Sequence, residues 1–203
     1  MAGARTVDVL SSATAARSRR GDVGDANAAP GAAQGVPWGD VFRRAPLFAL
    51  LATGLGSGLL PKAPGTWGSL LAVLLAEGLF DLYGIGAVAL LAALATAFGV
   101  PASARVAALL GRKDPPQVVI DEVAGQALAL ALLHLALPAV APPTLRWGLV
   151  ALAFGLFRLL DVVKPGPIDR VQSLPGGWGV MVDDLLAGLG AGILAAAAAF
   201  SFR

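Results

Sequence analysis

The stretch FRLLDVVKPGPIDRVQSLPGGWGVMVDDLLAG, residues 157–188, decides how the rest of this chain is interpreted. Its ionisable residues lie between two long apolar runs: Arg158, Asp161, Lys164, Asp169, Arg170, Asp183 and Asp184. Ionisable side chains at the border of a lipid-facing segment are energetically costly, and they mark a functional site by default. We therefore expect most of the chemistry of this protein in this stretch.

The composition is that of an integral membrane protein. Apolar residues make up 57% of the chain and charged residues 14%, whereas soluble domains have roughly half and a quarter. After a tail at 1–40, residues 41–203 suit one membrane-embedded helical domain. The sequence contains no Cys, which excludes thiolate metal sites and a cysteine nucleophile.

The N-terminal tail is predicted to be disordered, because residues 1–40 are rich in Ala, Gly, Ser, Asp and Arg without apolar periodicity. Up to Arg44 the chain holds six Arg against four Asp, and after it nine basic residues balance nine acidic ones. The positive excess in the tail indicates cytoplasmic retention rather than a nucleic-acid-binding surface. We expect no nucleic-acid partner, and the oligomeric state stays open.

The apolar runs predict an all-α, polytopic membrane bundle of about five spans. The segment Ala45–Leu60 is rich in glycine, and its sixteen residues would cover only about 24 Å of a roughly 30 Å hydrocarbon core. We interpret it as a re-entrant or interfacial helix. A polar connection is expected at 101–117, and the predicted spans lie at about 67–82, 84–100 (ending at Pro101), 118–137, 145–163 and 180–200.

This order of segments also predicts the topology. With the Arg-rich tail inside, basic residues collect in the cytoplasmic loops, as the positive-inside rule requires, and the uncharged loop at 138–144 falls outside. Five segments then bring their charged ends to the cytoplasmic face of the membrane. The residues concerned are Lys62, Asp121, Glu122, Arg158, Asp161, Lys164, Asp183 and Asp184.

The carboxylates at this face are candidate metal ligands and catalytic groups: Asp121, Glu122, Asp161, Asp183 and Asp184. Unpaired carboxylates that are brought together repel one another, so a bound cation is the simplest explanation. Oxygen ligands without His or Cys favour Mg²⁺ or Mn²⁺ over zinc. Acidic residues that merely complement a helix dipole are the alternative for each pair alone, but their coincidence at one face favours a site. The sequence does not divide the roles among them.

Basic residues and a glycine-rich turn at the same face predict phosphate binding. Arg158 and Lys164 lie on one side of a helix end, where they can grip a phosphate as a fork and as a point charge. Lys62 precedes Gly65 and Thr66, which can cap the next helix, and exposed amides at helix N-termini attract anions. The alternative is that Lys164 and Arg170 extend only to lipid headgroups.

Four blocks of the sequence resemble the phosphatidylglycerophosphatase A family: GSGLLPKAPGTWGSL (56–70), VVIDEVAGQ (118–126), FRLLDVVKPGPID (157–169) and GGWGVMVDDLLAG (176–188). The resemblance implies a Mg²⁺-dependent phosphatase of the bacterial inner membrane. This enzyme would remove the terminal phosphate of phosphatidylglycerophosphate to give phosphatidylglycerol. Leu60 and Gly166 depart from the family pattern, which commonly has a Ser and an aromatic residue there. Neither departure removes a charged group.

The residues themselves favour direct attack by metal-activated water. The usual covalent phosphatase nucleophiles are missing, since the chain has no Cys and its single His, His134, lies thirteen positions after Asp121, about 20 Å away along a helix. Another phospholipid head-group enzyme is an alternative, but the CDP-alcohol transferase signature is absent. A small membrane transporter would need charge at mid-membrane, where only Glu77 is a candidate.

Overall fold

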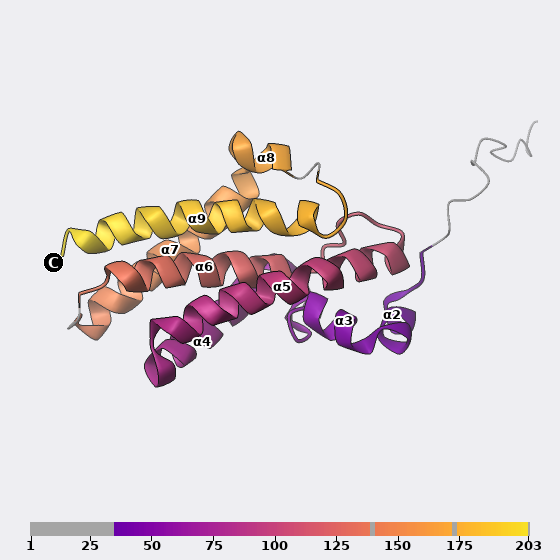
Figure 1. The fold of residues 1–203 in the computed structure, drawn as a ribbon, viewed down its shortest axis with the longest axis horizontal. Helices are drawn as coiled ribbons and strands as arrows, with labels where there is room; N and C mark the ends of the chain where they lie inside the picture. The colour runs from indigo at the N-terminus through magenta and orange to yellow at the C-terminus, as the bar shows by residue number, and fades with distance from the viewer. Residues whose placement is uncertain (1–34, 139–140, 172–173, 203) are drawn as a thin grey trace, which may run out of the picture. The chain divides into compact units, whose positions relative to one another are not determined.

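The computed structural model describes residues 35–138, 141–171 and 174–202, and these residues form an all-α fold without strands (Figure 1). The predicted boundary between tail and domain, at 40/41, falls inside the first described helix, and residues 1–34 lie outside the described part. The elements in chain order are α2 (Trp38–Arg44), α3 (Pro46–Ala52), the 3-10 helix η1 (Ser57–Leu59), α4 (Pro64–Tyr83), α5 (Ile85–Leu110), α6 (Ile120–Ala136), α7 (Pro143–Val163), α8 (Pro167–Val171) and α9 (Trp178–Phe200).

Three of the described helices, α4, α5 and α9, are long and apolar enough to cross a membrane. The chain is therefore a membrane protein of the all-α class. The five spans expected from the sequence also include α6 and α7, which lie beside α9 in Figure 1. Membrane crossing by these two helices stays a prediction.

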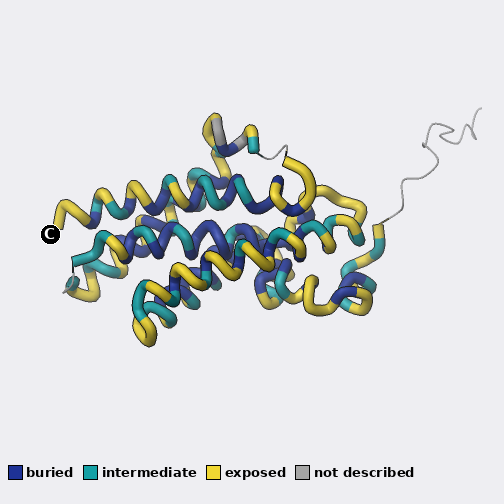
Figure 2. The backbone as a smooth tube through the Cα atoms, viewed as in Figure 1, coloured by how far each residue is buried: buried dark blue, intermediate teal, exposed yellow. Residues whose placement is uncertain are grey.

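Helix α6 is the central element of the bundle. It packs against α4, α5, α7 and α9, and twelve of its seventeen residues are buried, as its mostly dark blue trace in Figure 2 shows. A helix that is apolar on all sides needs such a position. Its first turn carries Asp121 and Glu122, and His134 lies in its last turn. The central helix thus brings ionisable groups to both of its ends.

The prediction that the third apolar run ends at Pro101 is wrong, because α5 continues to Leu110 with Pro101 inside it. An interior proline removes a backbone hydrogen bond and costs on the order of 3 kcal/mol. Packing offsets this cost. Ala102 and Val106 are fully buried in a core cluster that also includes Val41 of α2.

The segment predicted as one re-entrant or interfacial helix is divided in two. The α-helical part, α3, ends at Ala52, and a run of left-handed residues at Gly54, Leu55 and Gly56 leads into η1. The Val119 amide donates a hydrogen bond to the Ala52 carbonyl oxygen over 2.8 Å. This contact fixes the segment against the start of α6. Its interfacial position stays a prediction.

Candidate metal and phosphate site

A pocket of about 240 Å³ opens where the first turns of α4 and α6 and the second turn of α9 meet the last two turns of α7. It brings together all five predicted carboxylates, Gly65, and two of the three predicted basic residues. Lys62 and Thr66 are not among its lining residues. The ionisable residues that line the pocket are Asp114, Asp121, Glu122, Arg158, Asp161, Lys164, Asp183 and Asp184.

Three of the carboxylates form a cluster with the spacing of metal ligands. Asp121, Glu122 and Asp184 each offer one oxygen, and these oxygens lie within 4.8 Å of one another. Asp121 Oδ1, Glu122 Oε2 and Asp184 Oδ2 are also buried without a hydrogen-bond partner. Buried charged oxygens without partners are strongly destabilising, and hard oxygen donors are the ligands that Mg²⁺ prefers. The residues present therefore fit a divalent cation.

The close approach of α6 and α9 creates this cluster. At Gly125 a methyl group would overlap the Asp184 carbonyl oxygen, and at Gly188 it would overlap the Gly125 carbonyl oxygen. Glycine allows two helix backbones to approach more closely than any other residue does. The glycines thus place Asp184 of α9 beside the first turn of α6, where Asp121 lies.

Arg158 is held in the pocket by partners from three helices. Its guanidinium lies 2.8 Å from Asp161 Oδ2 and 4.0 Å from Glu122 Oε1, and Arg158 Nη1 donates a 3.3 Å hydrogen bond to Ser69 Oγ. Ser69 also donates a hydrogen bond to the Gly65 carbonyl oxygen. The arginine therefore links α7 to the first two turns of α4.

Lys164 follows the last residue of α7 and points into the same pocket. Its ammonium donates a 2.6 Å hydrogen bond to Asp183 Oδ2 and lies 4.0 Å from Asp161 Oδ1. Burial lowers the pKa of Lys164, but the hydrogen bond and the charge of Asp183 outweigh it, so the pKa lies above its ordinary value. Lys164 remains a cation at neutral pH. Its φ of 45° is left-handed, which costs a non-glycine residue roughly 1 kcal/mol or more.

The five predicted carboxylates therefore fall into two groups. Asp121, Glu122 and Asp184 form the cluster with metal-ligand spacing, which we call the acidic triplet, and within it only Glu122 approaches a cation, Arg158 at 4.0 Å. Asp161 and Asp183 each pair with a cation of the pocket. The sequence alone left this division open.

The first turn of α4 forms one wall of the pocket through backbone rather than side chains. A methyl group at Gly65 would overlap Glu122 Oε1 and would lie 3.2 Å from Arg158 Nη1. A larger residue here would have to displace the ends of the Glu122 and Arg158 side chains. The turn before it is strained, since Lys62 and Ala63 both have positive φ angles, 61° and 47°.

Two residues of the site were not singled out from the sequence. Ser69 lies in the first of the four blocks quoted above, and only the fold shows that its hydroxyl meets Arg158. Asp114 precedes the Pro115-Pro116 pair in the polar connection and lines the pocket as an exposed carboxylate. The acidic residue before two prolines was the available signal for Asp114.

Comparison with known proteins relates this chain to one family of phosphatases. The sequence model of the phosphatidylglycerophosphatase A family matches residues 50–199. A Haemophilus influenzae protein named phosphatidylglycerophosphatase A is 38% identical over 141 residues, which are 69% of this chain and 81% of the relative. The Escherichia coli K12 protein of the same name is 39% identical over 153 residues, covering 71% and 80%.

A third relative carries a different name. A Bacteroides thetaiotaomicron protein named putative phosphatidylinositol-3-phosphatase is 39% identical over 154 residues, which are 73% of this chain and 91% of the relative. No solved structure matches the chain. All three names describe phosphatases of phospholipid head groups.

Proposed function

This chain belongs to the phosphatidylglycerophosphatase A family and is a lipid phosphatase, and we propose that it hydrolyses the terminal phosphate of phosphatidylglycerophosphate in the pocket at the ends of α4, α6, α7 and α9. One observation carries the proposal. Three neighbouring carboxylates, each with a buried oxygen that has no hydrogen-bond partner, lie beside two cations, Arg158 and Lys164, in one pocket. This is the arrangement that a metal-dependent phosphatase requires.

The metal-binding residues in this proposal are those of the acidic triplet, Asp121, Glu122 and Asp184, with Mg²⁺ as the ion. A bound Mg²⁺ would neutralise the triplet, polarise the phosphoryl group and activate water. Asp161 and Asp183 contribute differently, because each already holds a cation of the pocket. We assign them the role of orienting Arg158 and Lys164.

The phosphate-binding residues in this proposal are Arg158 and Lys164, together with the amide-rich turn at Gly65. An arginine binds phosphate oxygens through paired N–H groups, and a lysine acts as a compact charge. Both are already oriented by carboxylates, so less conformational entropy is lost when the substrate binds. Lys62 and Thr66 flank the lining residues of α4 and have a supporting role at the rim.

The reaction is the hydrolysis of a phosphomonoester. The oxygen of water forms a bond to phosphorus, and the bond between phosphorus and the glycerol oxygen breaks. The leaving glycerol oxygen takes up a proton, and the products are phosphatidylglycerol and inorganic phosphate. Arg158 and Lys164 stabilise the negative charge on the phosphoryl oxygens in the transition state.

Phosphatidylinositol 3-phosphate is the second candidate substrate, because one of the relatives carries that activity in its name. Both lipids present a phosphomonoester on a head group, so the acidic triplet and the two cations serve either one equally. Head-group selection must then come from other residues of the pocket, such as Asp114 on its exposed side.

The test of the proposed function is phosphate release by the purified full-length protein from mixed vesicles that contain one substrate at a time. We expect a kcat/KM for phosphatidylglycerophosphate at least about tenfold above that for phosphatidylinositol 3-phosphate, a difference of about 1.4 kcal/mol. The reverse ratio would assign the second substrate. Release from neither lipid would contradict the proposed reaction.

We further propose that the pocket faces the cytoplasm and that the protein lies in the bacterial inner membrane. The basis is the distribution of basic residues in the sequence. Because the chain lacks Cys, single cysteines in place of the exposed residues Arg112 and Thr144 can report their sides. An impermeant thiol reagent should label Thr144→Cys but not Arg112→Cys in intact spheroplasts. The opposite pattern would reverse the orientation.

A further inference from the structure

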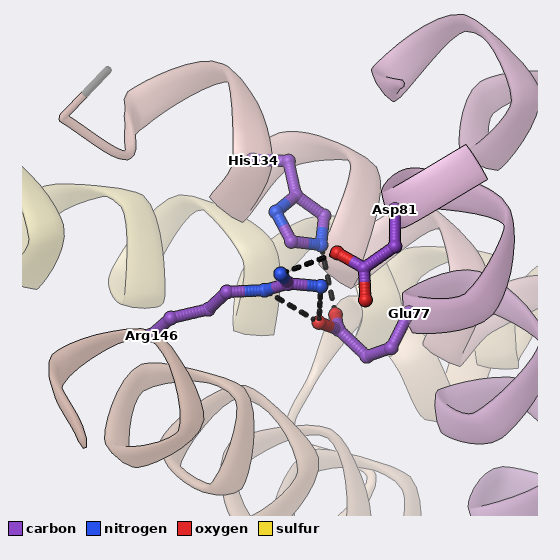
Figure 3. Close-up of polar contacts among 4 residues, drawn as sticks. All are labelled: Glu77, Asp81, His134 and Arg146. Carbon is purple, nitrogen blue, oxygen red and sulfur yellow. Dashed lines mark hydrogen bonds and ion pairs between the residues drawn. The ribbon is translucent and has the colours of Figure 1, made fainter. Parts of the chain in front are cut away.

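A second cluster of ionisable side chains lies at the other ends of α4, α6 and α7, away from the pocket (Figure 3). His134 Nε2 of α6 lies 2.8 Å from Glu77 Oε1 of α4, and Arg146 of α7 donates hydrogen bonds of 2.6 and 2.9 Å to Glu77 Oε2. The side chains of Glu77 and His134 are at most 4% exposed. We call Glu77, His134 and Arg146 the distal cluster.

Aromatic rings and one more acid enclose this cluster. Phe80 stacks on His134 with ring centroids 3.8 Å apart, and the Arg146 guanidinium lies 4.9 Å from the centre of the same Phe80 ring. At the exposed side Arg146 also pairs with Asp81 at 2.5 Å. Stacking and hydrogen bonds from several directions leave these side chains few alternative conformations.

The distal cluster and the pocket are in register along all three helices. The residues that meet at the pocket are separated by twelve positions from those that meet in the distal cluster: Gly65 from Glu77, Glu122 from His134, and Arg158 from Arg146. Twelve residues of an α-helix span about 18 Å. The same three helices therefore meet twice, at equal separations.

The two contact regions differ in the number of polar contacts that join α4 to α6 and α7. At the distal end, the buried Glu77 carboxylate of α4 makes three short polar contacts with α6 and α7. The exposed Asp81 of α4 adds a fourth contact, to Arg146. At the pocket, among the described residues, the polar contact of α4 with these helices is the 3.3 Å hydrogen bond between Ser69 and Arg158. A methyl group at Gly65 would overlap Glu122 Oε1 and one at Gly68 would overlap Val119 Cβ, so these further contacts of α4 are close packing rather than hydrogen bonds or ion pairs.

We propose that the distal cluster is a set of positioning residues that fixes the register of α4 against α6 and α7 and so sets the width of the phosphate pocket. Glu77 is buried and costly to ionise without partners, so α4 is held at the one register where it meets both His134 and Arg146. The wall of the pocket at Pro64 and Gly65 moves with the rest of this helix. Its distance from Arg158 then depends on contacts about 18 Å away.

The acidic triplet should be independent of this register, because its members lie on α6 and α9. Loss of the distal cluster is therefore expected to weaken substrate binding without weakening metal binding. A role in overall stability alone would predict less folded protein, with each folded molecule unchanged. The two roles give different results in the following experiment.

The test variant replaces the whole cluster with apolar residues, Glu77→Leu, His134→Phe and Arg146→Met, since hydrophobic replacement of a buried ion network is often tolerated. Arg146→Met alone, which leaves Glu77 without its arginine, is the second variant. Asp81→Asn is the matched control, because it removes an acid one turn further along α4 whose side chain is 57% exposed. All are made in the full-length chain.

The first measurement is the distance between spin labels at Trp67→Cys on α4 and Leu159→Cys on α7, two exposed positions beside the pocket, in detergent-purified protein. We expect a shifted or broadened distance distribution in the triple variant and the wild-type distribution in Asp81→Asn. An unchanged distribution in the folded triple variant overturns the positioning role. This measurement does not depend on the proposed reaction.

The second measurement is the kinetics of phosphate release, whose interpretation rests on the proposed function. We expect KM for the lipid to rise about tenfold in the triple variant, with a half-saturating Mg²⁺ concentration within about twofold of wild type. A shifted spin-label distance with an unchanged KM would overturn the link between the distal cluster and the pocket. If wild type itself released no phosphate, the proposed function would fail and the distance result would stand.

Discussion

The two ends of the α4–α6–α7 bundle differ in the ratio of acidic to basic side chains. At the distal end, Glu77 and Asp81 face Arg146 and His134, and both oxygens of Glu77 have partners. At the pocket, six carboxylates line a space that contains only two basic side chains, and four of the carboxylates keep a buried oxygen without a partner.

This difference supports a structural role for the distal cluster and the proposed catalytic role for the pocket. Balanced and paired charges of the distal end hold helices together without help from outside. The pocket has three times as many carboxylates as basic side chains, and this excess supports the proposed binding of an added cation. The two cations that it does contain are placed to meet an anion. We therefore base the proposed catalytic role on the excess of carboxylates over cations in the pocket, since charged side chains alone are present at both ends of the bundle.

The largest effect is expected from removing one oxygen ligand of the acidic triplet. Asp184→Asn should lower kcat by about a hundredfold or more, a loss of about 2.7 kcal/mol in transition-state stabilisation, because it removes a ligand from the acidic triplet. Asp183→Asn is the neighbouring comparison, and its loss should be smaller because Asp183 orients Lys164. The measurement is the rate of phosphate release at saturating lipid and Mg²⁺.

The order of these two rates tests which carboxylates are metal ligands and which orient the cations of the pocket. Melting temperatures close to wild type for both variants are the control for folding. Equal losses would place Asp183 among the metal ligands. A larger loss for Asp183→Asn would move the metal site away from the acidic triplet.

A smaller effect is expected from replacing one of the two basic side chains of the pocket. Lys164→Met should raise KM about tenfold, since a charged hydrogen bond to the substrate is worth on the order of 1.5 kcal/mol. Lys62→Met is the matched control, because Lys62 is exposed and lies outside the pocket lining, and its KM should change less than about threefold. KM values from the same vesicle assay give the comparison. A larger effect at Lys62 would show that the turn before α4 closes over the substrate.

The smallest effect on rate is expected from a substitution at the contact between α6 and α9, which supports the pocket. Gly188→Ala places a methyl group against the Gly125 carbonyl oxygen and should cost about 1–3 kcal/mol of stability, with only a several-fold fall in turnover. Gly155→Ala on α7 meets nothing within 4 Å and should leave stability equal or higher. Thermal unfolding in detergent measures both. Equal stabilities would mean that α6 and α9 can separate without cost.

The sequence predicted that the carboxylates at the ends of the apolar runs would lie together, because acidic and basic residues at such ends are visible without a structure. Asp121, Glu122, Asp161, Asp183 and Asp184 all line the pocket. Their division into three and two was not predictable. It depends on how α9 rotates about its close contact at Gly125 and Gly188, and helical spacing alone does not determine that rotation.

Long-range packing explains the other differences. Pro101 does not end α5, because the residues after it are buried against α2 and α3. Glu77 finds partners 57 and 69 positions away in the chain, so no local pattern marks it as paired. Ser69 likewise meets Arg158 across 89 positions. Local sequence patterns identified the candidate carboxylates and basic residues, and tertiary contacts determine which partners each of them has.

The central claim is that the acidic triplet binds the metal on which the phosphatase depends, and Mn²⁺ binding tests it without reference to turnover. Titration of the metal-free protein with Mn²⁺, followed by electron paramagnetic resonance of the free ion, should show saturable binding in wild type. The same binding should persist in Asp183→Asn and should be weakened at least about tenfold in Asp184→Asn. Absence of saturable binding in wild type, or equal binding in all three proteins, would contradict the claim.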